Sequence, residues 1–143
     1  MILDRVNAIC YACLSPRTDL SLLEEWCEIM KHECVAFHAV DGQGQDIYHT
    51  NVMMALGETF VVICMDTVRD ATEKRNLIEH FKATKKEVIE ISLAQMLSFA
   101  GNMLQVRNDS GQTFLVMSKQ AYESLNETQI ADIQKHTEIL HAD

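Results

Sequence analysis

Short apolar runs alternate with amphipathic segments along the chain. Residues 1–3 and 8–14 are apolar and flank a short polar turn, which predicts a β-hairpin. Residues 18–31 begin with a cap-forming Thr-Asp pair and carry apolar side chains at helical spacing, which predicts a helix. Residues 34–40 are again apolar and predict a short strand. The expected order of elements is therefore strand, strand, helix, strand.

The same order recurs twice more. Residues 51–91 contain two apolar runs around a Gly-Glu turn, then a helix opened by Asp-Ala-Thr-Glu, then a last apolar run. A linking helix leads to residues 102–142, which repeat the pattern; we expect the capping box Ser-Leu-Ala-Gln at residues 92–95 to open this helix and Gly101 to stop it. Units of roughly 50 residues, at about 1–40, 51–91 and 102–142, indicate a repeat architecture within one domain over residues 1–143. The helix in each unit indicates the α/β class.

A histidine stands at the start of the second unit. His49 follows a polar, glycine-bearing loop over residues 41–46 and precedes the apolar run 52–56, which we predict to be a strand. Loops at strand ends are where a rigid scaffold presents working side chains, so His49 is a candidate functional residue. The alternative is a histidine that ends a strand and makes only local hydrogen bonds.

Composition and charge narrow the classes of function. Of the 143 residues, 48% are apolar and 23% are charged, which suits a compact domain and argues against disorder. The formal net charge of −9 disfavours nucleic acid and anionic membranes as partners, because both need a basic surface. No apolar run approaches the ~18 residues of a membrane span. Asp4 and Arg5 make the start of the chain unlike a signal peptide.

The five cysteines predict neither disulfides nor metal binding. Their odd number favours a reducing, cytoplasmic setting over a disulfide framework. Cys10 and Cys13 form a Cys-x-x-Cys sequence, but residues three apart on a strand point to opposite faces, which excludes joint redox or zinc chemistry. Cys27, His32 and Cys34 match no known ligand pattern. We therefore predict no metal and no cofactor.

Three short motifs resemble those of a known superfamily. Residues 14–18 read Leu-Ser-Pro-Arg-Thr, residues 48–51 read Tyr-His-Thr-Asn, and residues 99–104 read Phe-Ala-Gly-Asn-Met-Leu. In order and spacing they are similar to motifs of the guanidino-group modifying enzymes, also called the amidinotransferase or pentein superfamily. The resemblance covers essentially the whole chain. The segments Ala-Cys-Leu-Ser-Pro-Arg-Thr-Asp and His-Thr-Asn-Val-Met-Met are most similar to the bacterial citrulline hydrolase branch, which is related to arginine deiminases.

The resemblance implies a particular fold. Members of the superfamily form a propeller of five ββαβ units around a pseudo-fivefold axis, and the three units counted above would be part of such a propeller. The chain would then start after the family's second unit and stop before its C-terminus. Two faces of the partial α/β-propeller would lack neighbours, so we expect the chain to self-associate or to pair with the missing segments.

The resemblance also implies a reaction. In the family, a cysteine near the C-terminus attacks the guanidinium or ureido carbon, and a histidine protonates the leaving amine and then activates water. By resemblance, His49 is this general acid and base, and Arg17 binds the substrate carboxylate with its fork of donors. Asn51 stands where arginine deiminases carry an aspartate, and its amide suits a neutral ureido group better than a cationic guanidinium. The partner implied is an amino acid with a guanidino or ureido group.

The sequence departs from the family in one central respect. None of the five cysteines falls at the position of the family's nucleophile, and the acidic residue that orients the histidine has no counterpart. We therefore expect a hydrolase of C–N bonds in linear amidines or ureido groups whose nucleophile lies outside this chain, and an inactive chain in isolation. The alternative is a non-catalytic binding module, because the same fold also serves a ribosome anti-association factor.

Overall fold

Three small sheets dominate the architecture. The computed structural model describes residues 1–142, and within them each sheet has three strands. In every sheet the middle strand pairs antiparallel with the first strand and parallel with the third. The first sheet holds β1 (Ile2–Asp4), β2 (Ile9–Leu14) and β3 (Glu33–His38); the second β4 (Met54–Leu56), β5 (Phe60–Ile63) and β6 (Glu87–Glu90); the third β7 (Leu104–Arg107), β8 (Thr113–Ser118) and β9 (Glu138–Ala142).

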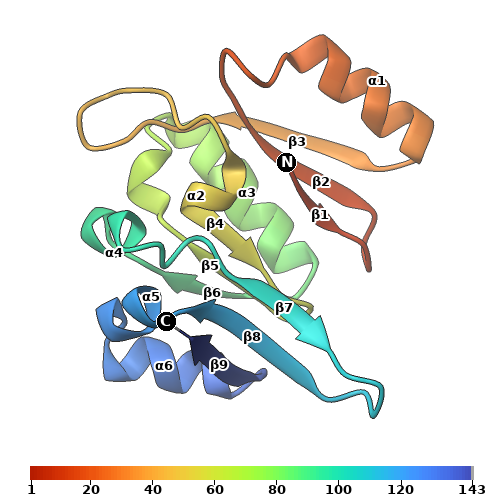
Figure 1. Ribbon diagram of the computed structural model, residues 1–143. Coiled ribbons are helices and arrows are strands. Elements are labelled where there is room, and N and C mark those ends of the chain that lie inside the picture. Colours follow the sequence, from red (N-terminus) through yellow and green to blue (C-terminus); the bar gives the residue numbers. More distant parts are fainter. Residues whose placement is uncertain (143) are drawn as a thin grey trace.

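Helices make the crossovers that the parallel pairs require (Figure 1). The α/β class and the order strand, strand, helix, strand within each sheet agree with the hydrophobic pattern of the sequence. The crossover helices are α1 (Leu20–Met30), α3 (Ala71–Ala83), and α5 (Lys119–Ser124) with α6 (Glu127–Gln134); α2 (Thr50–Met53) and α4 (Leu93–Leu97) link the sheets, and the 3-10 turn η1 (Met65–Thr67) precedes α3.

The helix caps follow the sequence with one exception. Ser92 and Gln95 form the complete capping box predicted for the linking helix. At the start of α3, Asp70 accepts hydrogen bonds from two backbone N–H groups, as predicted. The other half of this box is absent, because Glu73 turns away and accepts hydrogen bonds from the backbone N–H of His38, 2.8 Å away. The predicted capping box at Asp70 is therefore wrong in its second half, where Glu73 ties α3 to the first sheet instead.

Crossover helices lie between successive sheets. α3 contacts β3 of the first sheet as well as β6 of its own, and α6 contacts both β6 and β9. The rings of Tyr11 on β2 and Phe81 on α3 lie 5.3 Å apart across the first of these contacts. One buried apolar cluster continues through all three sheets, and a second, smaller cluster lies between α1 and the first sheet. α3 and α6 therefore each cover their own sheet and the preceding one.

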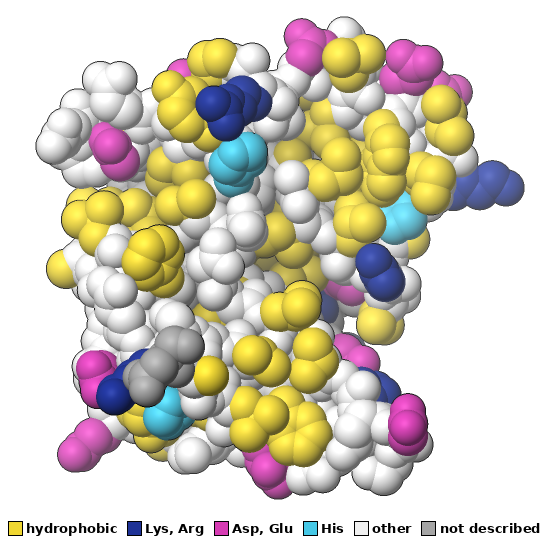
Figure 2. All heavy atoms as spheres, in the orientation of Figure 1, with side chains coloured by type: hydrophobic (Ala, Val, Ile, Leu, Met, Phe, Trp, Pro, Cys, Tyr) yellow, Lys and Arg dark blue, Asp and Glu magenta, His cyan; other side chains and the backbone are white. Residues whose placement is uncertain are grey.

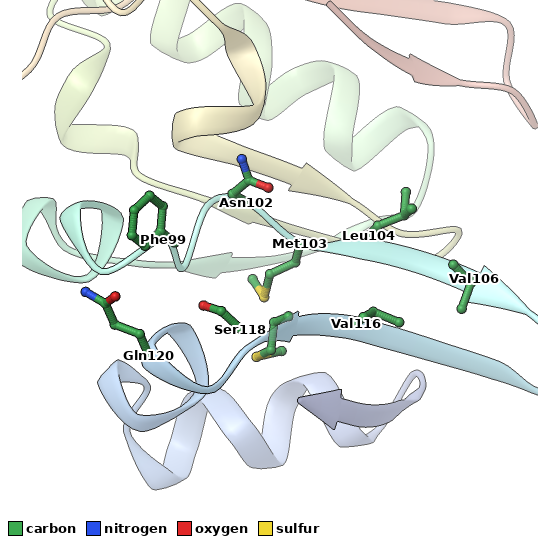
Figure 3. A pocket seen from close by; sticks show the side chains of 9 residues that line it. Phe99, Asn102, Met103, Leu104, Val106, Val116, Ser118 and Gln120 are labelled. Carbon is green, nitrogen blue, oxygen red and sulfur yellow. The ribbon is translucent and has the colours of Figure 1, made fainter. Parts of the chain in front are cut away.

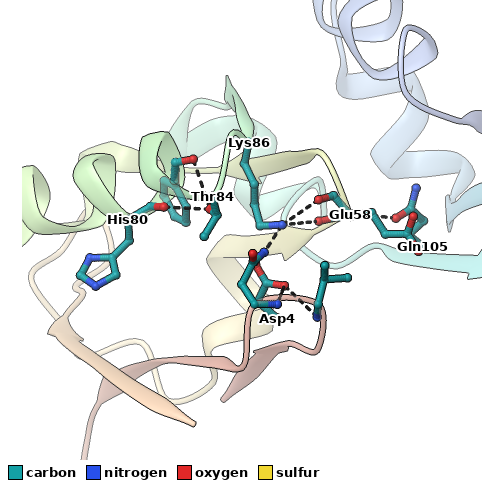
Figure 4. Close-up of polar contacts among 10 residues, drawn as sticks. Asp4, Glu58, His80, Thr84, Lys86 and Gln105 are labelled. Atoms are coloured by element: carbon teal, nitrogen blue, oxygen red, sulfur yellow. Dashed lines mark hydrogen bonds and ion pairs between the residues drawn. The ribbon is translucent and has the colours of Figure 1, made fainter.

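A buried ion pair joins the first two sheets (Figure 4). The ammonium group of Lys86 lies 2.9 Å from the carboxylate of Asp4, and both side chains are almost fully buried. Lys86 also donates hydrogen bonds to the carbonyls of Gly57 and Glu58, at 3.1 and 2.8 Å. Burial alone would raise the pKa of Asp4, but hydrogen bonds from Asn7 and Lys86 outweigh it and the pKa lies below its ordinary value. The pair therefore stabilises the fold above about pH 4, and this contribution is lost as the pH falls through the lowered pKa.

Removal of Lys86 leaves Asp4 charged and buried without its partner. We expect Lys86→Met to lower the free energy of unfolding by about 3–5 kcal/mol at pH 7. Urea unfolding followed by circular dichroism measures the change. The matched control is Lys82→Met, which removes a charge from the exposed side of α3. Equal losses in the two variants would show that the buried pair does not hold the sheets together.

Two glutamates at equivalent positions bridge neighbouring units. Glu33 and Glu87 are the first residues of β3 and β6, and each meets a histidine from the next unit. His80 on α3 lies 2.9 Å from Glu33, and His136 after α6 lies 3.0 Å from Glu87. The ring of His136 also stacks on Phe60 at 5.2 Å. The same kind of contact thus recurs at both boundaries between units.

The Glu33–His80 contact makes stability depend on pH. Burial would lower the pKa of His80, but the carbonyl of Asn76 and the carboxylate of Glu33 outweigh it, so the pKa lies above 6.5. A raised pKa gives stability that is complete below about pH 6.5 and is lost as the pH rises through the folded-state value. Because Glu33 is largely exposed, we expect a loss of only about 0.5–1 kcal/mol across this range. His80→Asn should flatten this part of the curve of unfolding free energy against pH; an unchanged slope would show that another group titrates.

Candidate active site

The segment that carries His49 is anchored by its neighbours. Ile47 and Thr50 are buried, whereas Tyr48 and His49 between them are exposed. The backbone N–H of Cys13, at the end of β2, donates to the Thr50 hydroxyl at 3.1 Å, and the Cys13 thiol donates to the Ile47 carbonyl at 3.2 Å. The two buried residues fix the segment to the first sheet, and this forces the histidine outward.

His49 precedes a helical turn, not a strand. Its backbone is extended, with φ −131° and ψ 124°, and its carbonyl accepts a hydrogen bond from Val52 N–H at 2.9 Å at the start of α2. The predicted strand over residues 52–56 is therefore partly wrong, because only its end forms β4. Within residues 1–142 the imidazole makes no hydrogen bond or ion pair. The structure therefore does not show the local hydrogen bonds that the alternative interpretation of His49 expected. Both ring nitrogens are available to a ligand.

Arg17 lies against the same segment. The chain turns sharply after β2, where Thr18 N–H donates to the Ser15 carbonyl at 2.9 Å. This turn places the Arg17 guanidinium 5.1 Å from the centre of the Tyr48 ring, in cation–π geometry. The Ser15 hydroxyl also donates to the Tyr48 carbonyl at 3.4 Å. Arg17 is thus brought to the residue that precedes His49, although Arg17 and His49 are 32 positions apart in sequence.

Asn51 faces a different space. It lines a groove of about 840 Å³ that runs along β1, β4 and β7, the first strands of the three sheets. These strands contact one another in sequence order, so the groove follows the line around which the units are arranged. Polar side chains of Asp4, Glu58 and Arg107 share the wall with Asn51, whereas His49 and Arg17 are not part of it. The structure therefore places Arg17 against Tyr48, the residue before His49, whereas Asn51 lines the groove.

A second hollow continues from the groove across the third sheet. It measures about 570 Å³ and shares Asn102, Met103, Leu104 and Val106 with the groove. Figure 3 shows its apolar lining, with Asn102 directed away from Gln120. No charged side chain lines this hollow.

Gly101 was expected to end the linking helix, but the structure requires a glycine there for a different reason. α4 ends at Leu97, and the left-handed residue after it is Phe99, with φ 66°. A Cβ atom on Gly101 would lie 2.3 Å from the Val52 carbonyl oxygen, a distance that no side chain tolerates. The glycine therefore lets the chain that enters the third sheet pass directly against α2, beside His49.

None of the five cysteines is prepared for nucleophilic attack. Burial is the main cause that raises the pKa of all five thiols, to about 11 for Cys34. Cys13 is nearest to the histidine segment, but its thiol is fully buried and bonded to the Ile47 carbonyl. Cys10 and Cys13 point into different clusters, which confirms that they do not act together.

The described residues contain neither a cluster of metal ligands nor a membrane-spanning helix. No group of three or more His, Cys, Asp or Glu side chains in residues 1–142 could hold a metal ion. No helix in that range has the length and apolar character to cross a bilayer.

Sequence reasoning missed the residues that support the site. Thr50 and Cys13 anchor the histidine segment, and Tyr48 carries the arginine. Tyr48 and Thr50 flank His49 in the same motif, and this adjacency could have identified them from the sequence. Nothing in the sequence links Cys13 to Thr50, because the contact joins residues far apart in the chain.

Comparison with known proteins identifies the family. A family model described as "N,N dimethylarginine dimethylhydrolase, eukaryotic" matches residues 1–143, so the chain belongs to this family and with it to the guanidino-group modifying superfamily. No curated protein matches the sequence.

Solved structures show the same fold at low sequence identity. The N-terminal domain of ArgZ, covalently bound to a reaction intermediate, has a TM-score of 0.73 and 17% identity over 98% of this chain. The apo structure of ArgZ, an arginine dihydrolase from the ornithine-ammonia cycle in cyanobacteria, has a TM-score of 0.73 and 15% identity over 98% of this chain. The complex of AgrE with ornithine and NAD+ has a TM-score of 0.72 and 18% identity over 98% of this chain. The match covers 46%, 20% and 18% of those chains, so this chain spans less than half of each.

The close approach at Gly101 predicts a local effect on the site. Gly101→Ala should destabilise the chain by about 1–3 kcal/mol, because the added methyl group meets backbone atoms that cannot move independently. It should also shift the ring signals of His49 in NMR spectra, since α2 must move away. The control is Gly42→Ala, where the new Cβ finds only ordinary contact with Leu93 at 3.9 Å. Unchanged His49 signals in Gly101→Ala would contradict the proposed support.

Proposed function

We propose that this chain supplies the histidine and substrate-binding side of an active site that hydrolyses C–N bonds in guanidino or ureido amino acids. The observation that carries the proposal is the family match over residues 1–143, together with a free imidazole at the position of the family's histidine motif. His49 would protonate the departing amine and then remove a proton from the attacking water. Arg17 would bind the substrate carboxylate through its planar guanidinium.

The nucleophile of this reaction would come from outside the chain. A thiolate must attack the guanidinium or ureido carbon, and every thiol here has a raised pKa. The related ArgZ domain has been seen both with a covalent intermediate and, as a Cys-to-Ser variant, with bound substrate. We propose that the three units are part of a five-unit propeller whose remaining units carry the cysteine and an acidic residue that would orient His49. The cytoplasm is the proposed setting, because the chemistry requires reduced thiols.

Asn51 would set the choice between substrates. AgrE and ArgZ are described with L-arginine, ornithine or product bound, so cationic ligands suit this fold. The amide of an asparagine is uncharged and can hydrogen-bond a neutral ureido group, whereas an aspartate there would leave a negative charge without a cationic partner. We therefore propose a preference for a citrulline-like over an arginine-like substrate. The competing function is a module that binds such amino acids without chemistry, and the cysteine pKa values favour it for the isolated chain.

Ligand titration of the 143-residue chain tests the binding half of the proposal. L-citrulline at millimolar concentration should shift the NMR signals of the His49 ring and the Asn51 side chain. Arg17→Ala should weaken this binding about tenfold, because a charge-assisted pair is lost. Arg75→Ala, which removes an exposed arginine from α3, is the control. Asn51→Asp should raise the affinity ratio of L-arginine to L-citrulline about tenfold.

Assays of turnover test the chemical half separately. The chain alone should release neither ornithine nor ammonia from L-arginine or L-citrulline. If the chain alone does release these products, and His49→Ala abolishes the release, then a residue of this chain is itself the nucleophile. Absence of any shift at His49 or Asn51 with every ligand would overturn the site assignment.

A further inference from the structure

The end of β2 holds both parts of the candidate site. Cys13, near the end of this strand, contacts the histidine segment through the Thr50 hydroxyl and through the Ile47 carbonyl. Arg17 follows four positions later, in the turn after the strand. The same strand end therefore fixes the segment that carries His49 and begins the turn that carries Arg17.

The turn and the segment meet at Tyr48. Its carbonyl accepts a hydrogen bond from the Ser15 hydroxyl at 3.4 Å. Its ring lies under the guanidinium of Arg17, whose central carbon is 5.1 Å from the ring centre. On the face drawn in Figure 2, a basic side chain and a histidine side chain lie next to each other near α2. The aromatic ring thus ties the arginine to the residue directly before the histidine.

The backbone at Tyr48 is fixed by its neighbours. Ile47, directly before it, is buried, and its N–H donates to the Ala39 carbonyl at 2.9 Å. Thr50, two positions after it, is buried as well. The tyrosine is therefore held at a defined place, whereas an arginine side chain by itself is long and has many rotamers.

Contact with an aromatic ring suits an arginine that must still bind a ligand. The attraction between a cation and a ring needs no acceptor atom. Within residues 1–142, the guanidinium of Arg17 makes no hydrogen bond and no ion pair. A neighbouring carboxylate would also hold the arginine, but it would occupy the N–H donors that a ligand carboxylate needs. The ring holds the side chain and leaves this fork of donors unoccupied.

We propose that Tyr48 is a positioning residue that holds Arg17 in place for the carboxylate of an amino-acid substrate. The inference rests on the proposed function, in which Arg17 binds that carboxylate. A long side chain loses rotamer freedom when it binds a ligand, and a contact that already exists in the free protein reduces this cost. Tyr48 acts through Arg17 and is not itself a ligand for the substrate. Its contribution is therefore limited to ligands that carry a free carboxylate.

NMR spectra of the free chain test the positioning itself. The face of an aromatic ring moves the signals of protons above it to higher field, so the δ-methylene signals of Arg17 should be shifted in the wild type. Tyr48→Phe keeps a ring and should keep this shift, whereas Tyr48→Leu should lose it. Arg17 signals that are the same in the wild type and in Tyr48→Leu would show that the contact does not persist in solution, and would overturn the proposal.

Titration with two ligands tests the effect on binding. L-citrulline has a free carboxylate, whereas L-citrullinamide carries a neutral amide in its place. Tyr48→Leu should weaken the binding of L-citrulline about two- to fivefold, which corresponds to a cation–π contact at an exposed site, and should leave the affinity for L-citrullinamide unchanged. Tyr48→Phe should bind both ligands like the wild type, because phenylalanine offers the same ring face.

A second tyrosine provides the matched control. Tyr122 lies on α5 in the third unit, where its ring stacks on His141. Tyr122→Leu removes the same side chain and should leave both affinities at their wild-type values. Thermal melts check that each variant keeps its fold. A loss of L-citrulline affinity in Tyr122→Leu as large as in Tyr48→Leu would show that the effect does not depend on Arg17.

The outcomes separate the inference from the proposed function. If Arg17→Ala weakens L-citrulline binding but Tyr48→Leu does not, the proposed function stands and the positioning role is wrong. If Tyr48→Leu weakens both ligands equally, the tyrosine only supports the segment. If Tyr48→Phe binds as weakly as Tyr48→Leu, the hydroxyl group contacts the ligand directly. Each of these results overturns the inference, whereas a wild-type chain that binds neither ligand overturns the proposed function and the inference with it.

Discussion

A small three-stranded sheet has two faces, and in this chain its own helix covers only one of them. The other face must be covered by the helix of the next unit, as α3 covers the first sheet and α6 the second. This single constraint accounts for the order of the units, for the apolar cluster that continues through all three sheets, and for the Glu–His pairs at both boundaries. Within residues 1–142, the equivalent apolar side chains on the third sheet and on α1 stay exposed, with Leu104 at 65% and Ile29 at 69%.

The position of the candidate site follows from the same arrangement. Stacked units bring β1, β4 and β7 side by side, and the groove along them receives the segments that link one unit to the next. His49 lies on such a segment, which is held by the contact of Thr50 with Cys13 and by the close approach of Gly101 to the backbone of Val52 and Met53. Arg17 reaches the segment through Tyr48. The candidate side chains are thus positioned by contacts of their neighbours, and the imidazole of His49 keeps its hydrogen-bonding groups free.

The sequence predicted what depends on local pattern. Alternating apolar runs and caps such as Ser92 with Gln95 specified the three α/β units, because periodicity and capping act within a few residues. It failed where a distant partner competes for a side chain or a backbone position: Glu73 leaves its predicted cap for His38, and the start of the strand predicted at residues 52–56 becomes a helical turn. His49 and Arg17 were found through motifs, whereas the anchoring of Thr50 by Cys13 depends on tertiary contact alone.

The most direct test of this account is amide hydrogen exchange along the chain. β5, which lies at the centre of the second sheet and is fully buried, should be strongly protected. α1 and the strands of the third sheet, whose outer apolar side chains are exposed within residues 1–142, should exchange faster than β5. Equal protection of α1, β5 and β8 would show that each sheet is complete without the helix of a following unit, and would contradict the account.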